Sequence, residues 1–506
     1  MRVRRLVEFT DRSLSRHGVV AYTLFNARTS TSMKLTVIGC GYLGATHAAC
    51  MAELGHDVLG VDVDADKVAR LRAGEVPFFE PGLADILRRN IAAGRLEFST
   101  SMQAAADHAS IHFIGVGTPQ RARGNGADTS YVFSAVESLA GLLRGEHLII
   151  GKSTVPVGTA AELADRIAAV SGGLADIELA WSPEFLREGF AVEDTLRPDR
   201  IVVGTDPDAD CRSAIAVISE LYREILETGI PFVTTDWATA ELVKSSANAF
   251  LATKISFINA VSELCEIVGA DVSTLADAIG YDNRIGRRFL NAGLGFGGGC
   301  LPKDIRAFMA RAEELGAHRA LRFLHEVDAI NMRRRAAMVE LIEDSCPGDL
   351  VGANIAILGA AFKPESDDVR DSPALSVAGQ LALRGASVTV FDPKAATNAQ
   401  RMYPMLNFAD SARDAAVDAD VIALATEWAE FVHMTPDEFD GVVRHKVIVD
   451  GRRCLSAAQW RGQGWEYWAL GGAVRAEGAT SAEVGAAAVR MPSMTSAPLP
   501  RRHVLG

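Results

Sequence analysis

A chain of 506 residues exceeds what one hydrophobic core usually supports, so we expect two or three domains. Hydrophobic residues make up 48% and charged residues 23%, as in an ordinary globular protein, and a net charge of −13 gives no sign of the clustered basic surface that nucleic-acid binding needs. No apolar run approaches the roughly 20 residues of a bilayer crossing, so we expect no membrane partner either.

Neither the ends of the chain nor its cysteines indicate secretion. Residues 1–32 are arginine-rich and lack the apolar core and cleavage site of a signal peptide. We interpret them as a loose extension, or as the product of an upstream start codon with Met33 as the functional start; for 1–32 and for the aperiodic tail at 476–506 we expect disorder. Seven cysteines at irregular spacing indicate reduced thiols, and hence the cytoplasm.

Between residues 33 and 235, short apolar runs alternate with helix-like stretches. The runs are "LTVIG", "DVLGVDVD", "SIHFIGVGTP", "HLIIGKSTVP", "IELAWSP" and "RIVVGT". Strands that recur between helices are typical of crossover units, so this part predicts a Rossmann-like domain with a parallel sheet and helices on both faces.

Strand signals vanish between residues 236 and 346. The stretch "WATAELVKSSANAFLATKISFINAVSELCEIVGA" has apolar residues at helical spacing, which predicts one long helix opening a central helical domain and offering a dimer surface. From residue 350 to 475 the alternation restarts with "NIAILGAAFK", "ASVTVFDP", "DVIALATEW" and "KVIVDGRR". The predicted fold class is therefore α/β, with two doubly wound parallel-sheet domains joined by the long helix.

The first predicted strand runs into a glycine pattern that suits a dinucleotide. Gly39, Gly41 and Gly44 have the G-x-G-x-x-G spacing, in which the glycines permit a tight turn, a close approach of pyrophosphate and helix packing. Asp62 ends the next strand, where a carboxylate accepts from ribose hydroxyls and favours NAD over NADP. Lys67 is the one residue that argues for caution, and an ordinary glycine turn with a surface aspartate is the alternative.

Two further loops follow apolar strands at the expected carboxyl edge of the sheet. "GVGTP" contains Thr118 and "STVPVGT" contains Thr154. Ligands of open α/β sheets bind along that edge, so both threonines are candidates for cofactor contact. The alternative is that they cap the following helices.

The stretch "LGFGGGCLPKD" places Cys300 in a glycine-rich loop. A thiolate attacks electrophilic carbon, and Lys303 is a cation that favours the thiolate, while Asp304 is placed to orient water or take a proton. The three glycines before the cysteine permit a sharp turn and keep bulk away from the sulfur in a flexible loop. A buried loop cysteine followed by a solvated ion pair is the alternative.

Polar residues at two other places suggest a site. Lys244 and Asn248 lie four residues apart on one face of the predicted long helix, where an amine and an amide can stabilise an oxyanion; a polar stripe on an exposed face is the alternative. Glu184 and Glu188 occur in "SPEFLREG". Acidic residues in a first helical turn favour the helix dipole, which explains Glu184 better than Glu188.

Three cations stand beside glycine turns or acidic residues. They are Arg284 in "YDNRIGRRFL", Lys363 in "GAAFKP" and Arg370 in "DDVRDSP". Cations in such places suit phosphate or carboxylate recognition, although each can equally be an ordinary surface charge.

Taken in order, the motifs resemble those of the UDP-glucose/GDP-mannose dehydrogenase family over residues 33–470. They are "GCGYLG", "GVGTP", "STVPVGT", "SPEFLREG", "NAFLATKISFIN", "GFGGGCLPKD", "GAAFKPESDDVRDSP" and "VDGRR". The segment "RIGRRFLNAGLGFGGGC" is similar to the UDP-glucose branch. The resemblance implies an NAD-dependent, four-electron oxidation of a nucleotide sugar's primary alcohol to a carboxylate.

Residue by residue, the resemblance implies roles within this reaction. Cys300 resembles the nucleophile that forms a thiohemiacetal and then a thioester, Lys244 and Asn248 the oxyanion-stabilising pair, and Asp304 and Glu184 the carboxylates of proton transfer and water activation. On the cofactor side it implies Tyr42, Leu43, Thr118, Thr154, Glu188, Lys303 and Arg370, beside the glycines, Asp62 and Lys67. On the substrate side it implies Phe185, Leu186, Lys244, Asn248, Phe289, Gly297, Lys363 and Arg452.

Arg284 resembles an arginine that reaches the partner subunit's site, which implies at least a homodimer. The partner small molecule is a UDP-sugar, and no metal is implied. Three alternatives stay open: another nucleotide sugar such as a UDP-N-acetyl-hexosamine or GDP-mannose, a two-electron NAD-dependent hydroxyacid dehydrogenase that needs no thiol, and a non-catalytic ligand-binding regulator.

Overall fold

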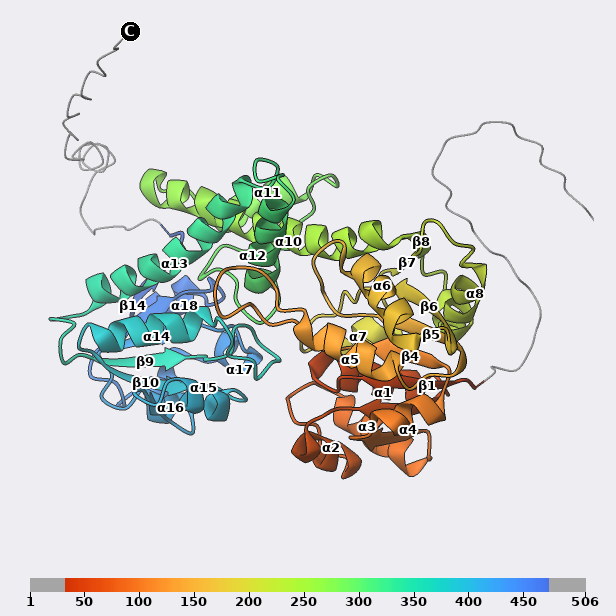
Figure 1. The fold of residues 1–506 in the computed structure, drawn as a ribbon. Coiled ribbons are helices and arrows are strands. Elements are labelled where there is room, and N and C mark those ends of the chain that lie inside the picture. Colours follow the sequence, from red (N-terminus) through yellow and green to blue (C-terminus); the bar gives the residue numbers. More distant parts are fainter. Residues whose placement is uncertain (1–31, 473–506) are drawn as a thin grey trace, which may run out of the picture. The chain divides into compact units, whose positions relative to one another are not determined.

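The computed structural model describes residues 32–472. The chain packs into two compact units (Figure 1). The first unit takes the described residues up to Ala249 together with Lys303–Leu321, and the second takes Phe250–Pro302 together with the described residues from Arg322 onward. The extension and the tail predicted at 1–32 and 476–506 lie, apart from residue 32, outside the described residues.

An eight-stranded sheet forms the centre of the first unit, in the order β3-β2-β1-β4-β5-β6-β7-β8. Its strands are β1 (Lys34–Ile38), β2 (Asp57–Val61), β3 (Leu96–Ser99), β4 (Ile111–Ile114), β5 (Gly145–Gly151), β6 (Ala175–Trp181), β7 (Ile201–Thr205) and β8 (Phe232–Asp236). Strands β1 to β6 are parallel, as predicted. Strand β7 pairs antiparallel with β6 through Trp181 and Gly204, and β8 pairs parallel with β7, so the predicted parallel sheet changes direction at β7.

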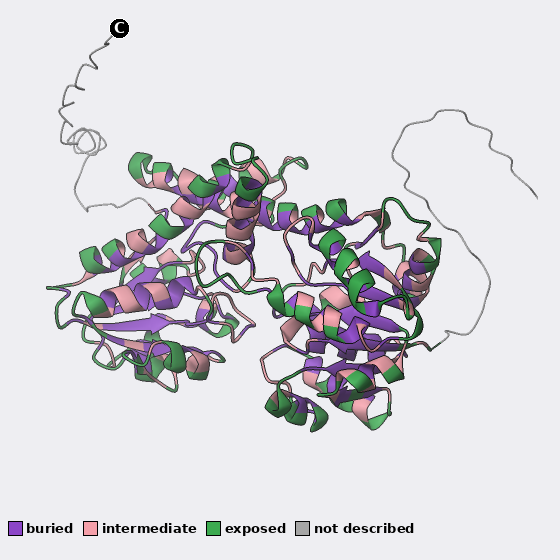
Figure 2. Cartoon of the chain, viewed as in Figure 1, coloured by how far each residue is buried: buried purple, intermediate pink, exposed green. Residues whose placement is uncertain are grey.

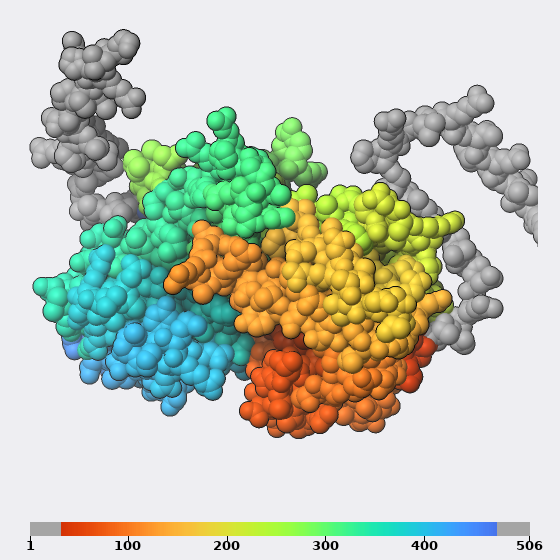
Figure 3. All heavy atoms as spheres, in the orientation of Figure 1, coloured from red at the N-terminus to blue at the C-terminus, as the bar shows by residue number. Residues whose placement is uncertain are grey.

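Helices cover both faces of this sheet. They are α1 (Tyr42–Glu53), α2 (Ala65–Arg72), α3 (Leu83–Ala92), α4 (Met102–His108), α5 (Ser130–Ala140), α6 (Thr159–Ser171), α7 (Ala191–Leu196), α8 (Arg212–Leu221) and α9 (Arg223–Leu226). Because strand side chains alternate between faces, Ile150 packs in the cluster of α1, α3 and α8, while Ile149 packs in that of α5 and α6. Strands β1, β2, β4 and β7 are accordingly buried along nearly their whole length (Figure 2). Helices α5 and α6 pack against each other on the outside of the sheet (Figure 3).

The long helix predicted from the sequence is confirmed as α10 (Trp237–Val268). It is followed by α11 (Val272–Gly280), α12 (Leu301–Glu314) and α13 (Phe323–Ser345), and the described residues between β8 and the next sheet contain no strand. The division between the two units falls within α10, after Ala249, and at the start of α12, before Lys303. Two helices therefore begin in one unit and end in the other.

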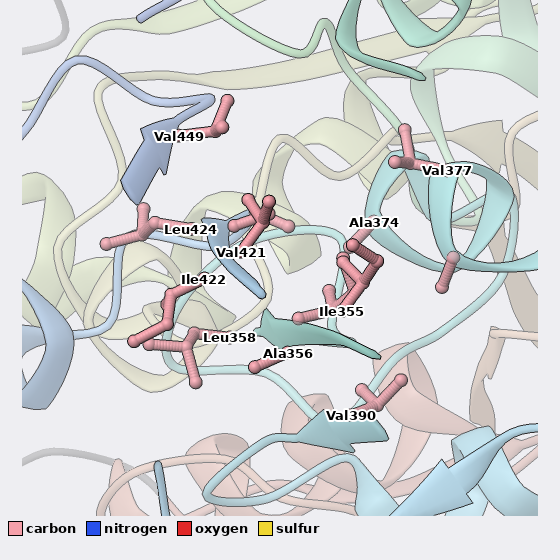
Figure 4. Packing of buried hydrophobic residues seen from close by; sticks show 14 of the residues in the cluster. Ile355, Ala356, Leu358, Ala374, Val377, Val390, Val421, Ile422, Leu424 and Val449 are labelled. Atoms are coloured by element: carbon pink, nitrogen blue, oxygen red, sulfur yellow. The ribbon is translucent and has the colours of Figure 1, made fainter. Parts of the chain in front are cut away.

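The second unit contains a six-stranded, all-parallel sheet in the order β11-β10-β9-β12-β13-β14. Its strands are β9 (Asn354–Leu358), β10 (Ser387–Phe391), β11 (Asn407–Phe408), β12 (Val421–Leu424), β13 (Val447–Asp450) and β14 (Glu466–Ala469). Its helices are α14 (Pro373–Leu383), α15 (Ala396–Met402), α16 (Ala412–Ala415), α17 (Ala429–Val432), the 3₁₀ turn η1 (Pro436–Phe439) and α18 (Ala457–Gly462). Side chains of β9, β10, β12, β13 and α14 build its core (Figure 4). The predicted fold class is confirmed.

None of the helices within residues 32–472 combines the length and the apolar character that a membrane crossing needs.

Candidate active site

The three glycines after β1 each serve a separate structural purpose. Gly39 has a φ of +88°, and a Cβ on it would lie 2.9 Å from the backbone of Val116. A Cβ on Gly44 would lie 1.7 Å from the carbonyl oxygen of Gly39, whereas one on Gly41 would meet no atom within 4 Å. Gly41 is the N-cap of α1 and provides no side-chain cap. The helix N-terminus is thus open to an anion, as a dinucleotide pyrophosphate requires.

Asp62 directly follows β2 and is buried. It accepts hydrogen bonds from the backbone N–H of Cys40 at 2.8 Å and of Asp64 at 3.0 Å, and forms an ion pair with Lys67 at 3.0 Å. The ammonium of Lys67 is therefore engaged by Asp62 itself. Burial, followed by the charge of Asp62, raises the pKa of the Cys40 thiol, so Cys40 is a neutral packing residue.

Thr118 and Thr154 join two loops at the carboxyl edge of the first sheet. The hydroxyl of Thr118 donates to the carbonyl oxygen of Thr154 at 2.7 Å, and the ammonium of Lys303 lies 3.4 Å from the same hydroxyl. The next helices are capped by Thr129 and Gly158 instead, so the alternative that these two threonines are helix caps is wrong.

Lys303 continues this network into α12 and α10. Its ammonium lies 2.7 Å from a carboxylate oxygen of Asp304, whose other oxygen accepts from the side-chain amide of Asn248 at 2.6 Å. Asp304 and Asn248 are both buried. Asp304 is thus buried while Lys303 is partly exposed, unlike the solvated pair that the sequence left open.

One turn earlier on α10, Lys244 is 4% exposed and forms an ion pair with Glu184 at 2.9 Å. The other oxygen of Glu184 accepts from the backbone N–H of Leu186 at 2.6 Å, and the ring centroid of Phe185 lies 5.7 Å from the lysine ammonium. The alternative of an exposed polar stripe is therefore wrong for this face of α10. Each of the two buried donors thus lies beside a carboxylate: the Lys244 ammonium beside Glu184, and the Asn248 amide beside Asp304.

Glu80 is a site residue that sequence reasoning missed. It is buried, accepts from the hydroxyl of Tyr42, and accepts from the backbone N–H groups of Gly189 at 2.6 Å and Ala191 at 2.7 Å. It therefore ties the start of α1, just after the glycine turn that follows β1, to the segment that carries Glu188. A glutamate in the turn "FFEPGL" has no periodic or motif signal that marks this role.

Glu241, one turn before Lys244 on the same helix face, was also missed. Its two oxygens accept from the backbone N–H groups of Gly158 and Ala160, each at 2.7 Å, at the start of α6. Burial raises its pKa to about 7. Nearby, the guanidinium of Arg311 donates to the carbonyl oxygen of Val157 at 2.9 Å. Glu241 and Arg311 together fix the loop that contains Thr154. Residues of this loop, of α10 and of α12 line a small cavity.

Cys300 belongs to the second unit, where it is exposed and stands one residue before α12. A Cβ on Gly297 would lie 2.4 Å from the carbonyl oxygen of Asp371, and one on Gly299 would lie 2.2 Å from the guanidinium carbon of Arg370. Close packing therefore requires glycine at 297, and Gly298 has a φ of +85° with the ring of Phe362 2.8 Å from where its Cβ would be, whereas the arginine side chain beside Gly299 is able to move. This corrects the flexible loop expected from the sequence, because bulk is already pressed against these residues.

Lys363 and Arg452 follow β9 and β13, at the carboxyl edge of the second sheet. Arg452 donates to the carbonyl oxygen of Ala425 at 2.8 Å and to that of Gly295 at 3.1 Å, so it links the sheet edge to the loop before the cysteine. Phe289 has a φ of +66°, a strained value for a residue with a side chain. Strain of this kind is concentrated at functional sites.

Arg284 and Arg370 each form an ion pair with a nearby aspartate. Arg284 pairs with Asp282 at 2.6 Å and keeps 89% of its side chain exposed, while Arg370 pairs with Asp368 at 2.7 Å. Neither is buried in a core.

The predicted residues are divided between the units. Those of the first unit are Gly39, Gly41, Tyr42, Leu43, Gly44, Asp62, Lys67, Thr118, Thr154, Glu184, Phe185, Leu186, Glu188, Lys244, Asn248, Lys303 and Asp304. Those of the second are Arg284, Phe289, Gly297, Cys300, Lys363, Arg370 and Arg452. Cys300 and Asp304 are four residues apart in the chain, on either side of the division.

Comparison with known proteins decides the family. Three sequence profiles match consecutive parts of the chain: the NAD binding domain of the UDP-glucose/GDP-mannose dehydrogenase family at residues 33–226, its central domain at 238–333 and its UDP binding domain at 356–457. The chain belongs to this family. The resemblance inferred from its motifs is confirmed, and so is NAD as the cofactor.

Several relatives of the family are similar over nearly their whole length. The UDP-glucose 6-dehydrogenase of Rhizobium meliloti is 42% identical over 440 residues, which are 87% of this chain and 99% of that protein. The UDP-glucose 6-dehydrogenase YwqF of Bacillus subtilis is 38% identical, over 87% of this chain and 98% of that protein. The solved structure of a UDP-glucose dehydrogenase from Pyrobaculum islandicum has a TM-score of 0.80 and 37% identity, covering 89% of this chain and all of that one.

Proposed function

We propose that this protein is a UDP-glucose 6-dehydrogenase, which oxidises the primary alcohol of UDP-glucose to the carboxylate of UDP-glucuronate. The observation that carries the proposal is the 42% identity over 99% of the length of a UDP-glucose 6-dehydrogenase. The structure of a UDP-D-ManNAc dehydrogenase from Pyrococcus horikoshii is also similar, with 26% identity and a TM-score of 0.73. The lower identity favours UDP-glucose over an N-acetylated sugar.

Cys300 is the proposed nucleophile. Its sulfur adds to the aldehyde carbon formed by the first oxidation, which gives a thiohemiacetal, and loss of a second hydride from that carbon gives a thioester. Water then cleaves the thioester, which releases the carboxylate and restores the thiol. Holding the aldehyde covalently prevents its escape between the two oxidations.

Lys244 and Asn248 are proposed to stabilise negative charge on the reacting oxygen. An ammonium and an amide N–H, both buried, act strongly there because solvent screening is low. Glu184 and Asp304 are the proposed groups for proton transfer and water activation. Each carboxylate is already bonded to one member of the donor pair, Glu184 to Lys244 and Asp304 to Asn248, which supports a shared role.

The open helix N-terminus at Gly41 and the carboxylate of Asp62 suit a dinucleotide, so we propose them for the pyrophosphate and the ribose. When bound, NAD supplies the hydride acceptor for both oxidations, so one sugar consumes two NAD. Beside them, the proposed cofactor contacts are Gly39, Tyr42, Leu43, Gly44, Lys67, Thr118, Thr154, Glu188, Lys303 and Arg370.

The substrate side is proposed to lie largely in the part that matches the UDP binding domain. Lys363 and Arg452 supply cationic groups for the diphosphate or the sugar, as anion recognition requires. The other proposed contacts are Phe185, Leu186, Phe289 and Gly297.

We further propose a homodimer built on α10. Phe250, Phe257 and Leu264 repeat every seven residues on this helix, and each is more than half exposed. Such an apolar stripe suits burial against a second copy of the chain. The exposed Arg284 is the proposed contribution to the partner's site. All seven cysteines are free of disulfides, which supports the cytoplasm as the compartment.

The test follows NADH absorbance while the purified protein is mixed with NAD and one sugar at a time: UDP-glucose, UDP-N-acetyl-hexosamines and GDP-mannose. We expect two NADH per UDP-glucose and the highest kcat/KM for that sugar. One NADH per turnover would indicate a two-electron dehydrogenase instead. Binding without NADH formation would indicate a regulator.

A further inference from the structure

The loop before the cysteine has an unusual environment. Residues 292–298 are all buried, yet they belong to no helix or strand. A buried irregular segment needs partners for its backbone N–H and C=O groups, which here are side chains from distant parts of the second unit. Asn259 accepts from the N–H of Gly293 at 2.9 Å, and Arg452 donates to the carbonyl oxygen of Gly295 at 3.1 Å.

Asn331, on α13, bonds both backbone groups of Phe296. Its side-chain oxygen accepts from the N–H at 2.8 Å, and its amide nitrogen donates to the carbonyl oxygen at 3.0 Å. This pair of bonds is what a neighbouring β-strand would provide. A Cβ on Gly295 would lie 2.2 Å from the same side-chain oxygen, so the amide also fixes how closely the loop approaches α13. Asn331 is completely buried.

Arg335, one turn later on α13, holds the same point of the loop from a second direction. Its guanidinium donates to the carbonyl oxygen of Phe296 at 3.3 Å and forms an ion pair with Asp371 at 2.7 Å. Arg335 is 3% exposed, and a charge so deeply buried needs a partner, which Asp371 supplies. Asp371 itself presses its carbonyl oxygen against Gly297. The loop is thus clamped at Phe296 and at the first of the three glycines.

Cys300 follows Phe296 by four residues, and Gly297, Gly298 and Gly299 stand between them. Glycines have no side chains of their own with which to anchor the chain, so this stretch is held through its backbone and through Phe296. The N–H of Gly298 donates to the carbonyl oxygen of Arg370 at 2.9 Å and that of Gly299 to Asp368 at 3.3 Å, while Phe296 is the point at which α13 holds the chain before the glycines. We propose that Asn331 and Arg335 are positioning residues that hold the Cys300 loop in place for attack on the substrate aldehyde. This inference rests on the proposed function of Cys300 as the nucleophile.

The test compares Asn331→Leu with Met332→Leu. Leucine has nearly the shape of asparagine but makes neither bond to Phe296, whereas Met332 is the next residue on α13 and is 44% exposed. A nucleophile displaced by about 1 Å reacts up to roughly 100-fold more slowly. We expect Asn331→Leu to lower kcat about 10- to 100-fold at nearly unchanged KM for UDP-glucose, with Met332→Leu at the wild-type value.

A second readout needs no turnover. The rate of Cys300 alkylation by iodoacetamide, followed on its peptide by mass spectrometry, should differ from wild type in Asn331→Leu and not in Met332→Leu. It remains readable if the wild type proves inactive on UDP-glucose, so failure of the proposed function and failure of this inference are distinguishable.

Two milder variants decide the matter if Asn331→Leu does not fold. Asn331→Asp keeps the oxygen that accepts from the N–H of Phe296 but loses the amide that donates to its carbonyl oxygen. Arg335→Lys keeps the positive charge beside Asp371 but loses the guanidinium group that contacts Asp371 and Phe296 together. Both should show a smaller fall in kcat and a shift in alkylation rate. Wild-type kcat and alkylation in folded variants would overturn the proposal, and so would a loss of thermal stability without change in either rate.

Discussion

The side-chain amide of Asn248 on α10 donates to the carboxylate of Asp304 on α12, with 2.6 Å between nitrogen and oxygen. The second oxygen of Asp304 lies 2.7 Å from the ammonium of Lys303. Asp304 is therefore a buried carboxylate with an amide donor at one oxygen and an ammonium beside the other. The amide hydrogen bond and the ion pair hold the carboxylate in a fixed orientation, as proton transfer in catalysis requires.

Replacing Asp304 by Asn should therefore abolish most of the activity. The amide cannot take up a proton, and it leaves the charge of Lys303 without its partner. We expect kcat to fall roughly 100-fold or more, as for the loss of a general acid or base, while the KM for UDP-glucose changes little. Glu314→Gln, at an exposed position of the same helix, is the control and should keep wild-type kcat. A kcat within threefold of wild type for Asp304→Asn would contradict the assignment.

Substituting Cys300 by Ser should separate the two oxidations. A serine hydroxyl is a far weaker nucleophile than a thiolate, so we expect UDP-glucuronate formation to slow by about 1,000-fold or more. Acid-quenched wild-type enzyme should show a sugar adduct on the Cys300 peptide in mass spectrometry. Cys346→Ser serves as the control for a cysteine outside the site. Full-rate acid formation by the serine variant would rule out covalent catalysis at this residue.

Glu80→Gln should weaken both NAD binding and stability. The carboxylate of Glu80 accepts hydrogen bonds from the Gly189 N–H and the Tyr42 hydroxyl, among others. A glutamine has only one acceptor oxygen, so its NH₂ group would face some of these donors and those hydrogen bonds would be lost. Losing hydrogen bonds to a charged group costs about 2 kcal/mol, which corresponds to a melting temperature several degrees lower. Glu75→Gln changes a largely exposed carboxylate and should leave both quantities unchanged. Equal melting curves and NAD affinities for the two variants would contradict this role.

Lys152 offers a pH-dependent prediction. Its ammonium lies among the rings of Phe113 and Tyr222, 3.4 Å from the hydroxyl of Tyr222, and burial lowers its pKa from 10.5 to about 8. The folded protein therefore releases this proton above about pH 8, while the unfolded chain keeps it until about 10.5. Between these values the unfolded state binds more protons, so this residue makes stability rise with pH.

Lys152→Met should accordingly raise the melting temperature at pH 7, because the folded protein no longer has to bury a charge. The gain is at most about 3 kcal/mol, and it should shrink as the pH rises from 8 to 10.5. Differential scanning calorimetry across this range measures it, with Lys34→Gln as an exposed control. A melting temperature at pH 7 that stays equal or falls would show that Lys152 is not destabilising.

Much of this architecture could be predicted from the sequence. Apolar runs between helical stretches indicated both sheets, helical spacing from Trp237 indicated α10, and the glycine spacing after β1 indicated the dinucleotide turn. Each of these signals lies within a few tens of consecutive residues. The direction of β7 does not, since a strand has the same local pattern whether it runs parallel or antiparallel to its neighbour.

The residues that fix the site were harder to predict. Glu80, Glu241 and Asn331 are single polar residues whose partners lie 109, 83 and 35 residues away in the chain. Nothing in their own neighbourhoods distinguishes them from residues exposed to solvent. The flexible loop predicted from the glycines before Cys300 was wrong for the same reason. The sequence shows that these residues lack side chains, but it does not show the atoms packed against them.

The sequence by itself thus determined the elements and the candidate reactive groups, because periodicity, glycine turns and a cysteine beside charged residues are local properties of the chain. Only the tertiary structure decided which carboxylates are buried and paired, which backbone groups they hold, and why the cysteine loop needs glycine. Hydrogen bonds and close contacts depend on distances in space, and these arise only when distant segments pack together.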